Sequence, residues 1–172
     1  MALEILDVGC NKVRAPEATS GIDYRPSPGV DIVHDLEQFP WPVADDRFDT
    51  ILCRDVIEHL TDVVQTMEEL HRIAKPGGLI KIWTPHFSHP NSFRDPTHKH
   101  HFSFGTFDYF TGDLAYPRYS EKQFRMRRRE FIFRKPYALG KFIARVSERW
   151  YEKHYAHRSP PHGLYFELEV VK

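Results

Sequence analysis

Short apolar runs separated by polar turns fill the first half of the chain. The first run covers residues 3–8 and ends at Gly9, which is typical of a buried parallel strand that leads into a ligand-binding turn. The same pattern predicts further strands over residues 20–24, 31–33, 48–53 and 79–83. Because strands that alternate with helices form parallel α/β sheets, we expect ligands to bind at the carboxyl ends of these strands.

One amphipathic helix is predicted between the fourth and fifth strands. Apolar residues recur at three- and four-residue steps from Val63 to Ile73, which is the spacing of one helix face. Thr61 is the expected N-cap, and the turn Lys75-Pro76-Gly77-Gly78 ends the helix. The helix therefore connects two neighbouring parallel strands, with the right-handed crossover that such units adopt.

The second half of the chain is predicted to complete the sheet. It reads as a loop over residues 86–103, a short helix over 104–110, a strand over 124–133, an amphipathic helix over 138–155 and a final strand over 164–171. The expected fold is α/β and Rossmann-like, with a mostly parallel seven-stranded sheet, helices on both faces and one antiparallel strand near the C-terminus. At 172 residues, we expect a single domain, with a cofactor-binding half (1–85) and an acceptor-side, sheet-completing half (86–172).

Composition indicates a globular protein whose two halves differ in charge. Hydrophobic residues make up 41% of the chain, yet no apolar run reaches the roughly 20 residues that a spanning helix needs. We therefore expect a cytoplasmic protein without a membrane partner, and buried, reduced thiols at Cys10 and Cys53. Residues 1–85 carry 8 basic and 15 acidic residues, a net charge of −7, whereas the rest carries 16 and 9, a net charge of +7. This asymmetry suggests that the second half meets an anionic or polar substrate.

Two residues at strand ends suggest an adenosine-containing cofactor. Gly9 lets the backbone approach a ligand that a Cβ atom would block. Asp23, at the end of the second strand, offers a carboxylate that can accept hydrogen bonds from two ribose hydroxyls. A dinucleotide dehydrogenase would use a similar pair, but its glycine fingerprint is absent here.

Five motifs in order and spacing resemble the class I S-adenosylmethionine-dependent methyltransferases, particularly the group called methyltransferase type 11. The resemblance covers residues 3–85, about half of the chain. Its motifs are Leu6-Asp7-Val8-Gly9-Cys10, Gly21-Ile22-Asp23, His34-Asp35-Leu36, Phe48-Asp49-Thr50-Ile51 with Asp55-Val56-Ile57-Glu58-His59-Leu60, and Glu69-Leu70-His71-Arg72-Ile73-Ala74-Lys75-Pro76-Gly77-Gly78. The resemblance implies S-adenosylmethionine as the cofactor and S-adenosylhomocysteine as its product.

The resemblance also implies which residues bind that cofactor. Asp23 would bind the ribose and Asp35 the adenine amino group, while Leu36 and Tyr24 would pack on the adenine ring. The full implied set is Asp7, Gly9, Cys10, Asn11, Asp23, Tyr24, Asp35, Leu36, Arg54 and Asp55.

Two departures from the family pattern concern the methionine end of the cofactor. By the resemblance, the backbone around Gly9, Cys10 and Asn11 would lie beside the methionine part of the cofactor. The family usually has glycine where this chain has Asn11. Asn tolerates the left-handed conformation better than most residues, so a tight turn is still expected. The usual helix between the first two strands is compressed into residues 12–19 and interrupted by Pro16.

A histidine-rich loop after the fifth strand is the candidate acceptor site. A histidine there could remove a proton from the acceptor, bind a metal or form an ordinary hydrogen bond within the loop. The candidate catalytic residues are His86, His98, His100 and His101.

A metal-assisted mechanism is the alternative interpretation of the same region. Asp55, Glu58 and His59 share one face of a helical turn, and His100 could reach across to complete a divalent-cation site. This arrangement resembles the metal site of small-RNA 3′-end 2′-O-methyltransferases, as does the loop over residues 94–107. In other methyltransferases, a Glu-His pair at this place fixes the turn without a metal.

The partner surface is a basic segment over residues 125–135. These basic residues could follow the phosphates of an anionic substrate, or they could lie on a solvated surface. They are Arg125, Arg127, Arg128, Arg129, Arg134 and Lys135. Only Met1 and Ala2 precede the first strand, so we expect a lid from residues 86–120, from the C-terminal region or from a second subunit of a homodimer.

The sequence thus predicts methyl transfer to an oxygen or nitrogen atom of a small polar metabolite or glycan-type acceptor. One alternative is a metal-dependent RNA-end 2′-O-methyltransferase. The other is a non-catalytic S-adenosylmethionine-binding module, which Asn11 favours.

Overall fold

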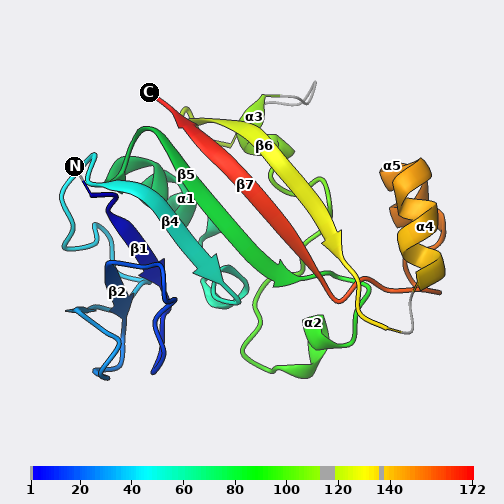
Figure 1. Ribbon diagram of the computed structural model, residues 1–172, viewed down its shortest axis with the longest axis horizontal. Helices are drawn as coiled ribbons and strands as arrows, with labels where there is room; N and C mark the ends of the chain where they lie inside the picture. Colours follow the sequence, from blue (N-terminus) through cyan, green and yellow to red (C-terminus); the bar gives the residue numbers. More distant parts are fainter. Residues whose placement is uncertain (1, 113–118, 136–137) are drawn as a thin grey trace.

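The computed structural model contains one seven-stranded sheet, seen face-on in Figure 1. The structure describes residues 2–112, 119–135 and 138–172. The strands are β1 (Ile5–Val8), β2 (Ser20–Asp23), β3 (Ile32–Val33), β4 (Phe48–Arg54), β5 (Ala74–Pro85), β6 (Gln123–Ile132) and β7 (Gly163–Val171). Their order is β3-β2-β1-β4-β5-β7-β6, with β7 antiparallel to both of its neighbours and the other pairs parallel. The predicted fold class is confirmed.

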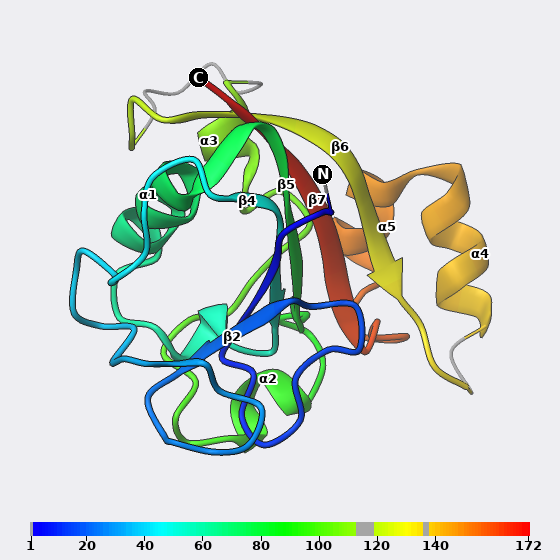
Figure 2. The same cartoon turned by 60° about the vertical axis from the view of Figure 1, so that its left-hand side comes forward.

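The helices cover the sheet unevenly. They are the 3-10 helix η1 (Ile57–His59), α1 (Val63–Ile73), α2 (Asn91–Arg94), α3 (Asp108–Thr111), α4 (Ala138–Val146) and α5 (Glu148–His154). Figure 2 shows α1 and α3 together on one side of the sheet, with α4 and α5 beside β6. Over the opposite face of β1 and β4, the compressed connection of residues 12–19 takes the place of a helix, and its Ala15 and Ala18 pack against Leu52. Most of the apolar core therefore lies under α1 and α3.

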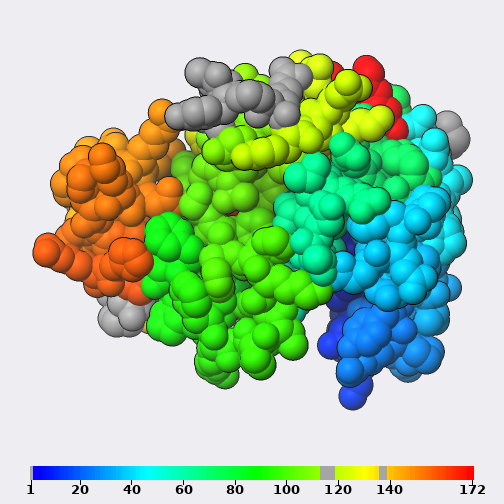
Figure 3. Space-filling model, turned by 180° about the vertical axis from the view of Figure 1, so that it is seen from behind, coloured from blue at the N-terminus to red at the C-terminus, as the bar shows by residue number. Residues whose placement is uncertain are grey.

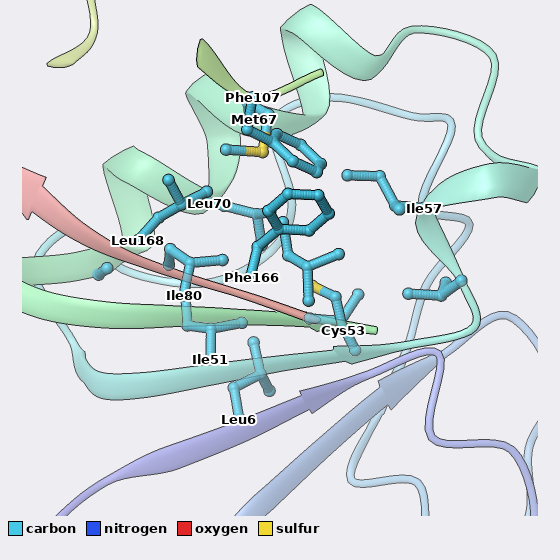
Figure 4. Packing of buried hydrophobic residues seen from close by; sticks show 14 of the residues in the cluster. Leu6, Ile51, Cys53, Ile57, Met67, Leu70, Ile80, Phe107, Phe166 and Leu168 are labelled. Atoms are coloured by element: carbon cyan, nitrogen blue, oxygen red, sulfur yellow. The ribbon is translucent and has the colours of Figure 1, made fainter. Parts of the chain in front are cut away.

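The core joins residues from all parts of the chain. In Figure 4, Met67 and Leu70 of α1 point toward Ile51 of β4 and Phe166 of β7, with Phe107 beside them. Each of these side chains is fully buried. This packing fixes the register of β4, β5 and β7. The candidate site lies at the carboxyl ends of β4 and β5 and at the amino end of β7.

The start of α1 differs from the prediction by one residue. The N-cap is Asp62, whose carboxylate accepts a hydrogen bond from the Gln65 backbone N–H at 2.8 Å. Thr61 instead donates both its N–H and its hydroxyl to Glu37. Both residue types cap helices well, so composition alone did not separate them.

The second half contains three further differences from the sequence-based expectation. The predicted loop holds the short helix α2, and the helix expected over residues 104–110 is confined to α3. The single helix expected over 138–155 is divided into α4 and α5 at Ser147, which is extended and accepts a hydrogen bond from the Trp150 backbone N–H. Residues 113–118 of the predicted lid segment lie outside the described residues. In the part of the chain that the structure describes, every helix is too short or too polar to cross a lipid bilayer.

Candidate functional site

The turn after β1 is held in a left-handed conformation at two positions. Gly9 has φ 66° and Asn11 has φ 50°, which confirms that Asn11 accommodates the tight turn. A Cβ atom at position 9 would lie 2.5 Å from Cγ2 of Val56, in the turn after β4. The protein's own packing therefore requires glycine here, independently of any ligand.

Asp23 lies at the end of β2 and anchors this turn. Its side chain is buried, and its two carboxylate oxygens accept hydrogen bonds from the Asn11 N–H at 2.9 Å and the Arg25 N–H at 3.1 Å. Each oxygen retains a lone pair for a further donor. Asp23 is thus preorganised to accept hydrogen bonds from a diol while it also stabilises the turn.

The other predicted cofactor residues divide into structural and exposed groups. Asp7 is buried and accepts hydrogen bonds from the Ala15 N–H and the Arg54 guanidinium, both at 2.7 Å. Leu36 belongs to the apolar core, whereas Tyr24 is 58% exposed and presents an aromatic face at the sheet edge. Asp35 is exposed and accepts a hydrogen bond from a backbone N–H two residues further on.

The thiol group of Cys10 is buried beneath the same turn. Burial, together with the negative charges of Asp7 and Asp23, raises the pKa of this thiol to about 11. Cys53 is also buried, and burial raises its pKa as well. Both cysteines are free thiols, as the sequence predicted, and neither is activated as a nucleophile.

A cavity of about 760 Å³ opens beside the ends of β4 and β5. It is lined by the turn after β4 (Asp55, Glu58, His59), the end of β5 (Trp83, Thr84, Pro85), the loop around α2 (Asn91, Arg94, Asp95, Pro96, His98) and the β6 and β7 ends (Ile132, Arg134, His162, Gly163). The cavity is large enough for a small ligand and has a largely polar lining.

Glu58 is the most unusual group in this cavity. Its side chain is 1% exposed; one oxygen, Oε2, accepts a hydrogen bond from the Thr84 hydroxyl at 3.1 Å, but Oε1 has no hydrogen-bond partner among the described residues. Burial raises the pKa of this carboxyl to about 7. Because buried polar atoms are nearly always paired, Oε1 indicates a missing ligand atom or proton.

Two histidines surround this unpaired oxygen. His98 Nε2 lies 4.0 Å from Glu58 Oε1, and His59 stacks edge-on against His98 with ring centroids 4.6 Å apart. The ligand atoms that Glu58, His59 and His98 can offer all lie within 4.8 Å of one another. His98 Nδ1 lies 3.1 Å from the Ser92 carbonyl, an acceptor, so Nδ1 carries the proton and the neutral ring keeps a lone pair on Nε2. The cluster can therefore accept either a proton or a divalent cation.

Comparison with known proteins identifies the first half of the chain. Residues 6–82 match the family model described as a methyltransferase domain. This part of the chain is a methyltransferase domain, and it is similar to the domains of the class I S-adenosylmethionine-dependent methyltransferases. Members of this family use S-adenosylmethionine as the methyl donor. The matched residues include the motifs on β1, β2 and β4 and the motif at the junction of α1 and β5.

The curated relatives of this chain share the same region. The ubiquinone/menaquinone biosynthesis C-methyltransferase UbiE of Geotalea daltonii is 34% identical over 87 residues, covering 49% of this chain and 33% of that protein. A probable S-adenosylmethionine-dependent methyltransferase of Mycolicibacterium smegmatis is 30% identical, covering 48% and 38%, and the mitochondrial 2-methoxy-6-polyprenyl-1,4-benzoquinol methylase of Rattus norvegicus is 33% identical, covering 44% and 20%. The matched parts thus span between a fifth and two fifths of these relatives.

Solved structures match the fold of almost the whole chain. An S-adenosylmethionine-dependent methyltransferase from Mesorhizobium loti superposes with a TM-score of 0.63 at 16% identity, covering 98% of this chain and 91% of that one. The [4+2]-cyclase SpnF gives the same TM-score at 16% identity, covering 99% and 75%. Because a cyclase shares the architecture, the fold alone does not specify the reaction.

The structure places one of the four candidate catalytic histidines in the cavity. His98 lines it, whereas His86 is fully buried, with its ring nitrogens against the Ser88 hydroxyl at 2.8 Å and a Glu152 carboxylate oxygen at 3.0 Å. His100 donates from Nε2 to the Thr61 carbonyl, so the predicted fourth metal ligand lies outside the compact cluster and His98 takes its place. His101 stacks on an exposed phenylalanine ring outside the cavity lining.

Sequence reasoning assigned no role to Arg94 or His162, which line the cavity together with Arg134 of the predicted basic segment. Arg94 belongs to α2, Arg134 follows β6, and His162 precedes β7. Burial lowers the pKa of His162, and the positive charge of Arg134 lowers it further. The strand order brings these residues together, because β7 lies between β5 and β6.

The arginines of the basic strand β6 form ion pairs within the protein. Arg125 and Arg127 both contact Glu169, Arg128 contacts Glu130, and Arg129 contacts Asp108 at 2.6 Å. These ion pairs favour the solvated-surface interpretation of the strand over a track for phosphates. Arg134, in contrast, faces the cavity, and Lys135 is exposed.

Proposed function

We propose that this methyltransferase binds S-adenosylmethionine at the β1–β2 edge and methylates an oxygen or nitrogen atom of a small polar acceptor in the neighbouring cavity. The observation that carries the proposal is the cluster of Glu58 and His98 within a polar cavity at the carboxyl ends of β4 and β5. Methyl transfer to a protic acceptor requires a base and a bound cofactor on the same side of the sheet. This site offers a base, a buried carboxyl group and the cofactor edge together.

The residues at the sheet edge fit this cofactor. The carboxylate of Asp23 can accept hydrogen bonds from the ribose hydroxyls, and the exposed ring of Tyr24 offers a surface for the adenine. When bound, the cofactor supplies a methyl group on a sulfonium, which transfers without help from an acid. The protein therefore has to hold the acceptor in line and accept its proton.

The cavity side chains can meet both requirements. His98 Nε2 carries a free lone pair in the neutral ring and can accept the acceptor's proton. The guanidinium groups of Arg94 and Arg134 line the same cavity and can orient an anionic group of the acceptor. Two curated relatives are named for quinone or quinol methylation, but this charged lining favours a small polar acceptor over a long isoprenoid chain.

A calorimetric titration with S-adenosylhomocysteine, run beside one with NADH, tests the proposal. We expect a dissociation constant in the micromolar range for S-adenosylhomocysteine and no detectable heat from NADH. If the protein binds S-adenosylhomocysteine but consumes no S-adenosylmethionine with any of the polar acceptors tested, the result would support the non-catalytic module instead. A protein that binds neither compound contradicts the assigned cofactor edge.

A metal-assisted RNA-end 2′-O-methyltransferase is the second candidate function. The unpaired Glu58 oxygen beside His59 and His98 favours it, because a carboxylate and two imidazoles suit a divalent cation that orients paired hydroxyls.

Manganese binding separates this candidate from metal-free transfer. Under the metal-assisted mechanism, we expect the protein to bind Mn²⁺ calorimetrically, Glu58→Gln to weaken that binding at least about tenfold, and chelation to abolish turnover of an RNA-end substrate. Glu17→Gln, which changes an exposed carboxylate in the loop after β1, is the matched control. Turnover that is unchanged by chelator, together with no Mn²⁺ binding, excludes this candidate.

A further inference from the structure

Helix α4 presents three large apolar side chains to solvent. Leu139, Phe142 and Val146 are 58%, 66% and 78% exposed, and their three- and four-residue spacing places them along one face. The inward face consists of Gly140 and Ala144, which are buried, and of Ile143, which packs against the small core cluster around Tyr151. The exposed face is thus an apolar stripe without an intramolecular partner among the described residues.

The next helix, α5, carries a further exposed aromatic side chain and is firmly attached to the rest of the protein. Trp150, at the start of α5, is 52% exposed. The next residue, Tyr151, is fully buried and donates its hydroxyl to the Ser159 carbonyl at 2.6 Å. Glu152 accepts hydrogen bonds from the Phe104 backbone N–H at 2.6 Å and binds the ring of His86 at 3.0 Å. The apolar stripe is therefore displayed on a fixed support.

Close packing also holds α4 in this orientation. A Cβ atom at Gly140 would lie 2.4 Å from the Ser159 hydroxyl oxygen and 2.8 Å from its carbonyl oxygen. A helix rotated to bury Phe142 would bring a far larger side chain to this contact. Exposure of the stripe is thus built into the packing.

Positive charge surrounds the stripe. The segment of residues 134–158 carries seven basic residues and two acidic ones, a net charge of +5. Lys141 and Arg145 are exposed and follow the stripe along one flank of α4, and Arg149 and Lys153 are exposed on α5. One of the two acidic residues, Glu152, is engaged inside the protein. The surface that α4 and α5 offer a partner is therefore both apolar and strongly cationic.

We propose that α4 and α5 form a docking surface for an anionic lipid bilayer. A helix with Phe, Leu and Val on one face, a neighbouring Trp and flanking Lys and Arg residues suits the boundary between acyl chains and anionic headgroups. Figure 1 and Figure 3 show both helices, in orange, at one end of the molecule, opposite β1 and β2. Docking would leave the cofactor edge in water. The inference does not depend on the proposed methyl transfer.

Charge complementarity distinguishes this partner from a second copy of the chain. In a twofold dimer through α4, the same surface meets itself, so Lys141 and Arg145 would face their own counterparts. An anionic surface neutralises the same charges and also accepts the apolar side chains. The sequence suggested no membrane partner because it has no apolar run long enough to span a bilayer. That reasoning does not apply to a helix that lies on the bilayer surface.

Sedimentation with lipid vesicles tests the proposal. We expect the purified protein to bind phosphatidylcholine vesicles that contain phosphatidylglycerol, to bind pure phosphatidylcholine vesicles far more weakly, and to be released by salt. The double variant Phe142→Ser/Val146→Ser should bind at least about tenfold more weakly because two inserted side chains are lost. Lys141→Glu/Arg145→Glu should weaken binding by roughly 25-fold or more, at about 1 kcal/mol for each basic residue removed.

Two matched controls make the same chemical changes elsewhere. Leu3→Ser removes another exposed apolar side chain, and Lys12→Glu/Lys122→Glu reverses two other exposed lysines. Retained vesicle binding in both controls, with unchanged thermal unfolding of all variants, supports the docking surface. The proposal is overturned if the wild-type protein ignores anionic vesicles, if the controls lose as much binding as the α4 variants, or if light scattering shows a dimer that Phe142→Ser/Val146→Ser dissociates.

Discussion

Replacing Asp23 with Ala is expected to lower the affinity for S-adenosylhomocysteine at least about 100-fold, because two hydrogen bonds from ribose hydroxyls to a charged acceptor are lost together. The carboxylate also accepts the N–H groups of Asn11 and Arg25, so part of the loss would come from a loosened turn. Calorimetric titration of the variant beside the wild-type protein measures the change in affinity.

A second acidic residue separates ribose binding from loop anchoring. Asp31 accepts a hydrogen bond from the Gly21 N–H at 2.7 Å and pairs with Arg14, so it also fastens the turn region but lies outside the assigned ribose position. We expect Asp31→Ala to lower thermal stability as much as Asp23→Ala while the protein retains most of its affinity. Equal loss of affinity in both variants would mean that Asp23 acts only through the turn, and unchanged affinity in Asp23→Ala would reject the assigned cofactor edge.

Replacing His98 with Ala is expected to reduce kcat by about 10²- to 10⁴-fold with a small change in KM, which is the usual contribution of a positioned general base. Its Nδ1–H is held by the Ser92 carbonyl, so the ring has one orientation and directs Nε2 into the cavity. His98→Gln should lose the same factor, since glutamine can keep a hydrogen bond to the carbonyl but cannot accept a proton.

His101 is the control within the same loop. It stacks on Phe93 with ring centroids 4.0 Å apart and does not line the cavity, so His101→Ala should keep its turnover. Added Mn²⁺ distinguishes the two functions of His98. If excess metal restores the turnover of His98→Ala, His98 acts as a metal ligand. If turnover stays low, His98 acts as a base. Full activity in His98→Ala would contradict the proposed catalytic role.

The regular elements of this fold were predictable because their apolar periodicity is strong. The run over residues 79–83 became the central part of β5, and the helical spacing from Val63 to Ile73 matched the span of α1, although the N-cap is Asp62 and not Thr61. The division of α4 from α5 was not predictable in the same way, because apolar spacing continues through Ser147. Only the extended backbone of that residue and its capping hydrogen bond mark the break.

The sequence indicated where the candidate site lies in the fold, but it did not indicate which histidine lines the cavity. Sequence placed Asp23 at a strand end and histidines in the loop after β5, and both positions are correct. It could not choose His98 over His86, His100 or His101, because a loop has no periodicity from which side-chain direction follows. His162 could not be predicted for another reason. It lines the cavity because β7 pairs with β5, which is a contact between distant parts of the chain.

The position of β7 has a consequence for how this protein matures on the ribosome. β7 fills the gap between β5 and β6, although both of those strands precede it in the sequence, and among the described residues β6 pairs with no other strand. Until residues 163–171 have been synthesised, one edge of β5 stays open and β6 has no ladder to join. A nascent chain therefore keeps these strand edges exposed until β7 has been synthesised. The same closing step brings together the cavity walls that Gly163, Trp83 and Ile132 contribute.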